Sequence, residues 1–407
     1  MKSNMKLWHK VTFALIAGVI FGLIAKDKVI YVKPIGDIFI GLIKMVVVPL
    51  IYCSLVTGIT SMNNKNSIGR IGIKSTIAFL TTTIFAISIG LIIGEVMKPG
   101  IGVTLSFNND LAMNMKTEFD FLKFLINIVP HNAIGALATG ETLQVVFFAI
   151  FTGITLNKMG DSGKRLIEIF HLLSQMVFKM IGMIMELSPY GAFALTALVI
   201  GTQGFDIVFS LGKLIIAVVI AMAFQYLIFG VLIKVFAKIS PMPFYKKSLE
   251  YQALAFSTSS SKATLPTTMK VCEEKLGISK SSTAFILPLG ASINMDGMAI
   301  YLGMCAVFFA QCTGVVLSTS DYFMIILTAT LGSIGAAGIP SGSIVMLPLV
   351  LSSVGLPIEG VAIIAGIDRI LDMMRTTINI TGDATVTLII DKSEGTLNEE
   401  LYYAKTE

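Results

Sequence analysis

The stretch DRILDMMRTTINITGD, residues 368–383, places charged side chains at helical spacing within apolar sequence. Steps of four, three, four and four residues separate Asp368, Asp372, Arg375, Asn379 and Asp383. On a helix these side chains share one face, within an arc of roughly 80°. Four charges facing lipid at mid-membrane would cost on the order of 10 kcal/mol, since insertion scales give about 2.5–3.5 kcal/mol for each. The stretch therefore predicts a helix whose polar face meets a cavity, an ion or a charged ligand.

The rest of the chain has the composition of a membrane protein. Of 407 residues, 55% are hydrophobic and 14% charged, and the mean hydropathy is +0.83, whereas soluble domains average about 25% charged residues. Apolar runs of roughly twenty residues suit helices that cross a bilayer. No cleavable signal peptide is evident, and the net charge of +5 has no basic cluster suited to nucleic acid. The cysteines, without metal or redox spacing, are expected to be buried thiols: Cys53, Cys272, Cys305 and Cys312.

Six conventional spans are predicted before residue 240, at 7–25, 34–60, 74–97, 120–157, 164–202 and 208–238. Pro130-His131-Asn132 and Thr139-Gly140-Glu141 interrupt the fourth, and Ser188-Pro189-Tyr190-Gly191 interrupts the fifth. Lysine and arginine concentrate in alternate loops, so the N-terminus and the loop after the sixth span are expected to be cytoplasmic. We expect a multi-pass protein of the inner (plasma) membrane with both termini in the cytoplasm.

After residue 240 the pattern changes to two interrupted segments, each followed by a long helix. The segments are 244–275, with the tip STSSSKATLP at 257–266, and 322–357, with the tip GSIGAAGIPSG at 332–342. The long helices are expected at 282–313 and 360–391. Paired interrupted segments of this kind indicate the binding site of a transporter. The prediction is an all-α protein with eight transmembrane helices and two re-entrant helical hairpins, arranged as inverted repeats.

Both tips have a functional and a structural interpretation. The first offers hydroxyls and backbone N–H groups where a half-helix begins, which suits an anion. The alternative is a Ser-rich cytoplasmic loop, which Leu265-Pro266 and the apolar flanks disfavour. Glycines let the second tip approach a ligand closely. Its alternative is a kinked span packed against its neighbours.

Oxygen-rich motifs indicate a cation. Asn294-Met295-Asp296-Gly297 puts a carboxylate and an amide oxygen where the 282–313 helix would unwind, and hard cations take such ligands. A structural alternative has Asp296 hydrogen-bonded within the bundle. Thr81-Thr82-Thr83 could add hydroxyls, although such threonines more often bond back to their own helix. For the stretch at residues 368–383, the structural alternative to a ligand site is an internal ion pair of Arg375 with Asp368 or Asp372. Such a pair would leave two negative charges of the stretch unmatched.

These motifs together resemble the dicarboxylate/amino acid:cation symporter family, which includes glutamate transporters and archaeal aspartate-transporting homologues. The resemblance covers nearly the whole chain and is strongest at Ser259–Pro266, Asn294–Gly297, Ser333–Pro340 and Asp368–Asp383. It implies a homotrimer with an elevator mechanism. The scaffold would comprise residues 1–70 and the trimerisation helices of 118–203. The mobile transport domain would comprise 71–117 and 204–407.

The resemblance also implies a substrate site between the hairpin tips and the polar helix. The tip residues that would hold carboxylates, largely through backbone groups, are Ser260, Ser261, Gly338 and Ile339. The helix residues would be Asp372 and Thr376 for an α-amino group, Asn379 for an α-carboxylate and Arg375 for a side-chain carboxylate.

Sodium would bind at three places, as the coupling ion and without an organic cofactor. The first would use Gly290, Asn294, Asn379 and Asp383. The second would use Ser292, Ser333, Ile334 and Ala336, with Met295 nearby. The third would use Thr82, Thr83, Asn294, Asp296 and the backbone of Phe79.

Four positions depart from the family pattern. Lys262 stands where relatives usually have serine, and Met298 replaces a threonine near the side-chain carboxylate, which bears on specificity. Leu302 stands where proton-coupled animal relatives have glutamate, and Phe79 replaces a tyrosine of which only the backbone is used.

The sequence thus predicts a sodium-coupled symporter of aspartate or glutamate, and not an enzyme. The alternative is a proton- or sodium-coupled symporter of C4-dicarboxylates or neutral amino acids, although C4-dicarboxylate carriers of the family tend to lack the equivalent of Asp372. An anion channel would conduct without accumulating substrate. An intramembrane aspartyl protease would need two aspartates facing each other across helices, whereas here most lie on one helix.

Overall fold

The computed structural model describes residues 7–61, 68–103, 126, 129–203, 206–335 and 342–404. Within these ranges the chain forms helices and turns, and no strand. The predicted all-α class is therefore confirmed for the described part of the chain.

The first half of the chain contains long helices with breaks at the predicted places. Its helices are α1 Leu7–Ala25, α2 Lys33–Ser61, α3 Ile68–Met97, α5 Ala133–Thr139, α6 Thr142–Lys158, α7 Lys164–Glu186, α8 Ser188–Gln203 and α9 Asp206–Leu232. Gly140 separates α5 from α6 with a φ of +75°, a left-handed conformation that glycine adopts without strain. α7 ends at Glu186 and α8 begins at Ser188, so the predicted interruption of the fifth span is also confirmed.

The second half contains the predicted helix pairs. Its helices are α10 Met242–Thr258, α11 Ser261–Glu274, α12 Lys280–Ile293, α13 Asp296–Thr313, α14 Thr319–Gly335, α15 Gly342–Ser353, α16 Val361–Ser393 and α17 Glu399–Tyr403. α10 packs against α11, and α14 packs against α15. The turn between α10 and α11 lies at Ser259 and Ser260, within the predicted first tip. Most of the second tip, residues 336–341, lies outside the described residues.

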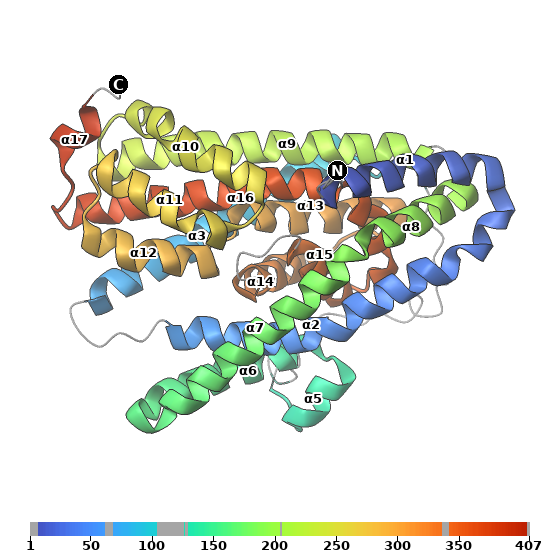
Figure 1. The fold of residues 1–407 in the computed structure, drawn as a ribbon, viewed down its shortest axis with the longest axis horizontal. Helices are drawn as coiled ribbons and strands as arrows, with labels where there is room; N and C mark the ends of the chain where they lie inside the picture. Colours follow the sequence, from blue (N-terminus) through green and yellow to red (C-terminus); the bar gives the residue numbers. More distant parts are fainter. Residues whose placement is uncertain are drawn as a thin grey trace, which may run out of the picture.

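α13 occupies the centre of the bundle. Every residue from Asp296 to Ala310 is buried, and the helix packs against α3, α9 and α16. Figure 1 shows these helices running together, with α2, α6 and α7 on one side of them. A Cβ atom at Gly90 of α3 would lie 2.4 Å from the carbonyl oxygen of Ile300, so only glycine permits this close crossing of α3 and α13.

Four described helical segments are long and apolar enough to cross a membrane: Arg70–Met97, Gly160–Ile184, Ile207–Ala237 and Lys280–Thr313. Shorter apolar helices occur at Ile16–Ala25, Val48–Thr57 and Gly342–Ser353. An apolar stretch of 18 residues within Lys280–Thr313 is wholly buried inside the protein, and the segment is interrupted at residues 294–295. The total of eight transmembrane helices and the re-entrance of the two helix pairs stay predictions.

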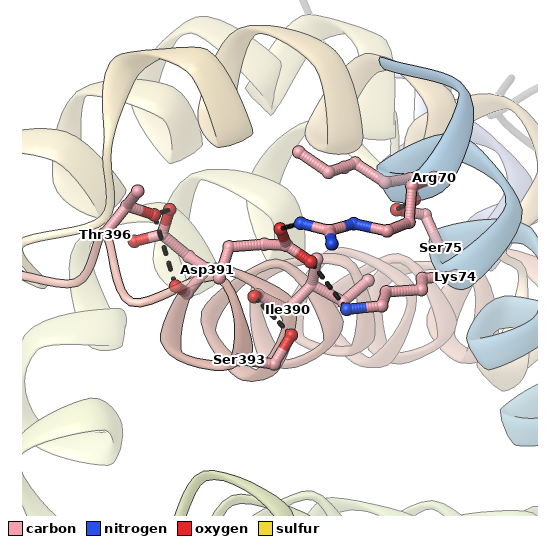
Figure 2. A network of polar contacts seen from close by, with 9 residues as sticks. Arg70, Lys74, Ser75, Ile390, Asp391, Ser393 and Thr396 are labelled. Carbon is pink, nitrogen blue, oxygen red and sulfur yellow. Dashed lines mark hydrogen bonds and ion pairs between the residues drawn. The ribbon is translucent and has the colours of Figure 1, made fainter. Parts of the chain in front are cut away.

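An ionic cluster joins the beginning of α3 to the end of α16 (Figure 2). Lys74 Nζ lies 2.5 Å from a carboxylate oxygen of Glu394, and the Arg70 guanidinium pairs with the other oxygen. The hydrogen bond from Lys74, together with that from Arg70, lowers the pKa of Glu394 below its ordinary value. Nearby, Asp391 accepts a hydrogen bond from Ser279 Oγ at 2.6 Å, which ties the start of α12 to the same end of α16.

Lys247 of α10 ties together the base of the first helix pair, the end of α10 and α11 that lies opposite the turn at Ser259 and Ser260. Its side chain is buried, and Nζ donates to the backbone carbonyls of Lys275, Leu401 and Tyr402 at 2.9, 2.8 and 2.7 Å. All three ammonium hydrogens are thereby used. Because these carbonyls lie at the C-terminal ends of α11 and α17, the positive charge also stabilises the negative ends of two helix dipoles.

Candidate functional site

The charged stretch at residues 368–383 lies on a helix, α16, as predicted, and its charged and amide side chains are buried. None of its five polar side chains is more than 5% exposed: Asp368, Asp372, Arg375, Asn379 and Asp383. α16 packs against α9, α10, α12 and α13. The stretch thus faces protein rather than lipid, and its partners come from those neighbouring helices.

Arg375 lies in a network of two carboxylates and an aromatic ring. Its Nη2 atom is 2.7 Å from Asp368 Oδ1 and 2.9 Å from Asp372 Oδ1. The guanidinium carbon lies 4.3 Å from the centroid of the Tyr301 ring, a cation–π geometry. Ser343 of α15 donates to Asp368 Oδ1 at 3.0 Å. The ion-pair interpretation is therefore correct for both aspartates, and the three side chains together carry a formal charge of −1.

This network has unused hydrogen-bonding capacity. Among the described residues, no partner is found for Arg375 Nη1, Asp368 Oδ2 or the Tyr301 hydroxyl, although all three are buried. A buried polar group without a partner costs about 1–3 kcal/mol. Arg375 therefore retains a donor for the acceptor group of a ligand.

A second cluster lies where the central helix is interrupted between α12 and α13. Asn294 donates from Nδ2 to Asp383 Oδ1 at 2.9 Å, and its Oδ1 accepts from the Thr82 hydroxyl at 3.3 Å. Thr83 donates to Asp296 Oδ1 at 3.1 Å. The predicted residues of the third sodium place, together with Asp383 of the first, thus lie in one connected network.

Close backbone packing brings Phe79 and Gly290 into this cluster. The Phe79 carbonyl accepts from the Thr82 hydroxyl at 3.0 Å. A Cβ atom at Gly290 would lie 2.6 Å from Asp383 Oδ1, so glycine allows the carboxylate to approach the backbone of α12. The donors are carboxylate, amide, hydroxyl and carbonyl oxygens, which suit a hard cation. No group of three or more His, Cys, Asp or Glu side chains that could hold a metal is found in the described ranges.

Gln225 of α9 belongs to this cluster but was not among the predicted site residues. Its Nε2 atom donates to Asp296 Oδ2 at 3.1 Å, and its Oε1 atom has no partner among the described residues. The sequence did offer a signal for Gln225, because it is an amide within the apolar segment 207–237. Tyr301 and Ser343 of the Arg375 network were also missed, and neither belongs to a motif that the sequence singles out.

Asn379 links the two clusters. Its Oδ1 atom accepts from the backbone N–H of Gly297 at 2.8 Å, and its Nδ2 atom donates to Met295 Sδ at 3.2 Å. A Cβ atom at Gly297 would lie 2.6 Å from the carbonyl oxygen of Arg375. The first turn of α13 thus contacts the backbone of α16 directly between the Arg375 network and the cation cluster.

Substitution of Gly297 by alanine is expected to lower the free energy of unfolding by about 1–3 kcal/mol, because the added methyl overlaps backbone that cannot rotate away. Denaturant unfolding of the purified protein measures the change. Gly72→Ala is the matched control, since a Cβ atom there would meet only the Phe285 ring at 3.4 Å or more. Equal stabilities of the two variants would contradict the close packing.

Three further predicted substrate residues lie at the start of α11 or on α16. Ser260 caps α11, where its side chain accepts from the Ala263 N–H at 3.3 Å, and Ser261 is buried in the first turn. Thr376 is also buried, on α16.

Two predicted sodium ligands use their hydroxyls within their own helices. Ser292 donates to the Pro288 carbonyl at 3.0 Å, and Ser333 donates to the Thr330 carbonyl at 2.7 Å. Ile334 belongs to α14, but its side chain is not among those described. Gly338, Ile339 and Ala336 lie outside the described residues.

The sequence was compared with known families and proteins. A model of the sodium:dicarboxylate symporter family matches residues 7–393. The chain belongs to this family. The proton/sodium-glutamate symport protein of Bacillus caldotenax is 36% identical over 402 residues, covering 96% of this chain and 95% of the relative. The C4-dicarboxylate transport protein of Bacillus subtilis (strain 168) is 37% identical over 408 residues, covering 98% and 96%. A protein of the same name from Rhodospirillum rubrum is 34% identical, covering 97% and 90%.

Membership confirms the family resemblance that the motifs predicted. The sodium:dicarboxylate symporter family consists of transporters and not of enzymes, and the apolar helices are those of a membrane protein. The names of the relatives divide between glutamate and C4-dicarboxylates, and the name of the glutamate relative gives both proton and sodium. The chain is accordingly a cation-coupled symporter of small organic acids.

Proposed function

We propose that this chain is a sodium-coupled symporter that takes up aspartate or glutamate across the bacterial plasma membrane. One observation carries the proposal: a single buried face of α16 bears both the Arg375 network and, eight residues on, Asp383 of the oxygen cluster. At the helical rise, the two lie about 12 Å apart along the axis. A ligand site and a cation site can therefore share one helix.

The Arg375 network favours an acidic amino acid. Its formal charge of −1 attracts a ligand with a positively charged group, and Asp372 would take an α-amino group. The unmatched Nη1 donor of Arg375 suits a carboxylate, because the guanidinium group binds carboxylates through charge-assisted hydrogen bonds. Only a molecule with an ammonium group and two carboxylates would bind both Asp372 and the Nη1 donor of Arg375. The same molecule would also make the predicted contacts with Asn379 and Thr376.

The oxygen cluster favours sodium as the coupling ion. Asp296 and Asp383 carry two formal negative charges, and no described cationic side chain contacts either one. Sodium would replace the present internal hydrogen bonds among Thr82, Thr83 and Asn294 with direct coordination. The other two sodium places would be completed by Gly290 and Asn379, and by Ser292, Ser333, Ile334, Ala336 and Met295.

The proposed cycle follows the family resemblance. The tips at Ser260–Ser261 and Gly338–Ile339 would close over the substrate. Residues 71–117 and 204–407 would then move as one transport domain against a scaffold formed by 1–70 and 118–203, within a homotrimer. The close packing of α13 against α3, α9 and α16 supports treating these helices as one moving unit.

A second candidate is C4-dicarboxylate transport, because similar relatives carry that name. Succinate or malate would supply two carboxylates but no ammonium group for Asp372. Asp372→Asn therefore separates the candidates: it is expected to reduce amino acid uptake strongly while affecting succinate uptake little.

Uptake into proteoliposomes tests the proposal. With an inward sodium gradient, labelled aspartate or glutamate is expected to accumulate above its external concentration, and succinate far less. Equal accumulation driven by a proton gradient without sodium would overturn the assignment of the coupling ion. Accumulation of succinate without the amino acids would overturn the substrate. Ionic current without accumulation would indicate an anion channel.

A further inference from the structure

A cavity of about 270 Å³, whose lining includes no residue of either cluster, lies between α1, α8, α9 and α16. Its walls include Val19 of α1, Ile200 of α8, Leu211 and Gly212 of α9, and Ile367 of α16. Figure 1 shows α1 and α8 crossing beside the beginning of α9, and α8 packs against α1, α9 and α16. The cavity therefore lies in the seam between the α1–α8 pair and the α9–α16 pair.

The lining selects an aliphatic occupant. Apart from the hydroxyl of Thr196, its side chains are hydrocarbon or glycine. A buried water needs two to four polar partners, whereas apolar cavities stay dry and accept apolar molecules. The volume exceeds the roughly 150 Å³ at which an apolar cavity already binds a small hydrocarbon. Water is thus a poor occupant, and a hydrocarbon chain a good one.

The surroundings supply such a chain. α9 belongs to the segment Ile207–Ala237, long and apolar enough to cross a membrane, and Ile16–Ala25 of α1 is also apolar. Beside the cavity, Ile16 and Ile20 of α1 and Phe209 and Ile216 of α9 are exposed. These side chains form an outer surface suited to lipid, so the cavity lies next to acyl chains of the bilayer.

A charged residue lies beside the cavity. Lys213 directly follows Gly212 on α9 and is exposed, and no carboxylate of the described residues forms an ion pair with it. It lies seven residues from the start of α9 at Asp206, or about 10 Å along the helix. From this depth a lysine side chain extends its ammonium group to the membrane surface, where lipid phosphates lie.

We propose that this cavity is a glycerophospholipid site, in which one acyl chain enters between the α1–α8 and α9–α16 pairs and the phosphate contacts Lys213. The site is independent of the transported substrate. Where the proposed elevator movement holds, the same chain fills the seam between scaffold and transport domain, and its binding would favour the state that contains this cavity.

Photolabelling tests the acyl-chain half of the proposal. The purified protein is placed in phosphatidylcholine–phosphatidylglycerol vesicles that contain a phospholipid with a diazirine near the end of one acyl chain. Labelling is expected at the cavity walls, within residues 196–215 and 363–367. Gly212→Leu is expected to reduce it several-fold, because a Cβ atom there meets nothing within 4 Å and the larger side chain fills the cavity.

Gly41→Leu is the matched control, since Gly41 lies in α2, is exposed and also has open space at its Cβ position. It is expected to leave the labelling of the cavity walls unchanged. Labelling spread evenly over the lipid-facing helices, or equal in wild type and Gly212→Leu, would overturn the acyl-chain site.

Lipid retention tests the headgroup half. Native mass spectrometry of the purified protein is expected to show several-fold less bound phosphatidylglycerol in Lys213→Gln than in wild type. Lys179→Gln, which removes an exposed lysine from α7, should match wild type. Equal retention in all three proteins would remove Lys213 from the site. Because neither readout requires transport, failure of the proposed transport function and failure of this site are distinguishable.

Discussion

Arg375→Met is expected to lower the free energy of unfolding by about 3–5 kcal/mol, the usual cost of removing one partner from a buried ion pair. The substitution would leave Asp368 and Asp372 as buried carboxylates without their cation, since both bond to the same Nη2 atom. It would also remove the group that stacks on Tyr301. Denaturant unfolding of the purified protein, followed by circular dichroism, measures the change.

A second substitution isolates the electrostatic part of this loss of stability. Asp368→Asn combined with Arg375→Met removes one of the stranded charges, so the double variant is expected to be more stable than Arg375→Met alone. Arg375→Lys keeps the charge without the planar fork and should lie between wild type and Arg375→Met. If Arg375→Met were as stable as wild type, the network would not be an ion pair of the strength that its burial implies.

The same position bears on substrate choice. Arg375→Cys is expected to shift uptake from acidic towards neutral amino acids, because the donor for the second carboxylate is lost. Competition of unlabelled aspartate and serine against labelled substrate measures the preference. Retained selectivity for acidic substrates would exclude Arg375 from the side-chain pocket.

Asp383→Asn is expected to raise the sodium concentration for half-maximal uptake by about tenfold or more, which corresponds to about 1.4 kcal/mol of binding free energy. The substitution removes one formal charge from the oxygen cluster and the carboxylate that accepts from Asn294. Sodium titration of uptake measures the effect, and sodium-dependent thermal shift gives a second readout.

Asp391→Asn is the matched control for this prediction. Asp391 is also a buried aspartate of α16, but it holds Ser279 and Thr396 at the end of the helix, outside the oxygen cluster. Its substitution should lower stability without changing the sodium dependence. Wild-type sodium dependence in Asp383→Asn would argue against Asp383 as a cation ligand.

Much of the helical framework follows from local sequence. The spacing from Asp368 to Asp383 predicted one buried helix face, and Gly140, Ser188 and the Asn294–Met295 pair marked helix interruptions that the structure contains. These predictions succeed because hydrophobic periodicity and helix-breaking residues determine local structure within a few positions of the chain. The beginning of α3 was predicted at residue 74 but lies at Ile68. The charges of Arg70 and Lys74 favoured a loop, whereas their pairing with Glu394 permits them on the helix.

The site was predictable in part. Motifs in the sequence named Asn294, Asp296 and Asp383, and the family resemblance grouped them into cation sites. Gln225 and Tyr301 could not be assigned in this way, because both reach the clusters through tertiary packing. Gln225 meets Asp296 where α9 packs against α13, and Tyr301 meets Arg375 where α13 packs against α16. A single residue in an apolar helix carries no local information about which neighbour it will meet. The arrangement of both carboxylates on one nitrogen of Arg375 likewise depends on side-chain geometry that spacing alone does not determine.

The contacts of Lys247 have a consequence for biosynthesis. Its ammonium group requires the carbonyls of Leu401 and Tyr402, which lie 154 and 155 residues later in the chain. Domains form progressively from the N-terminus as a chain is synthesised. The base of the first helix pair therefore cannot be completed until residues 401 and 402 have been synthesised, and until then Lys247 lacks two of its three acceptors. Residues of α17 thus complete a helix pair that was synthesised much earlier.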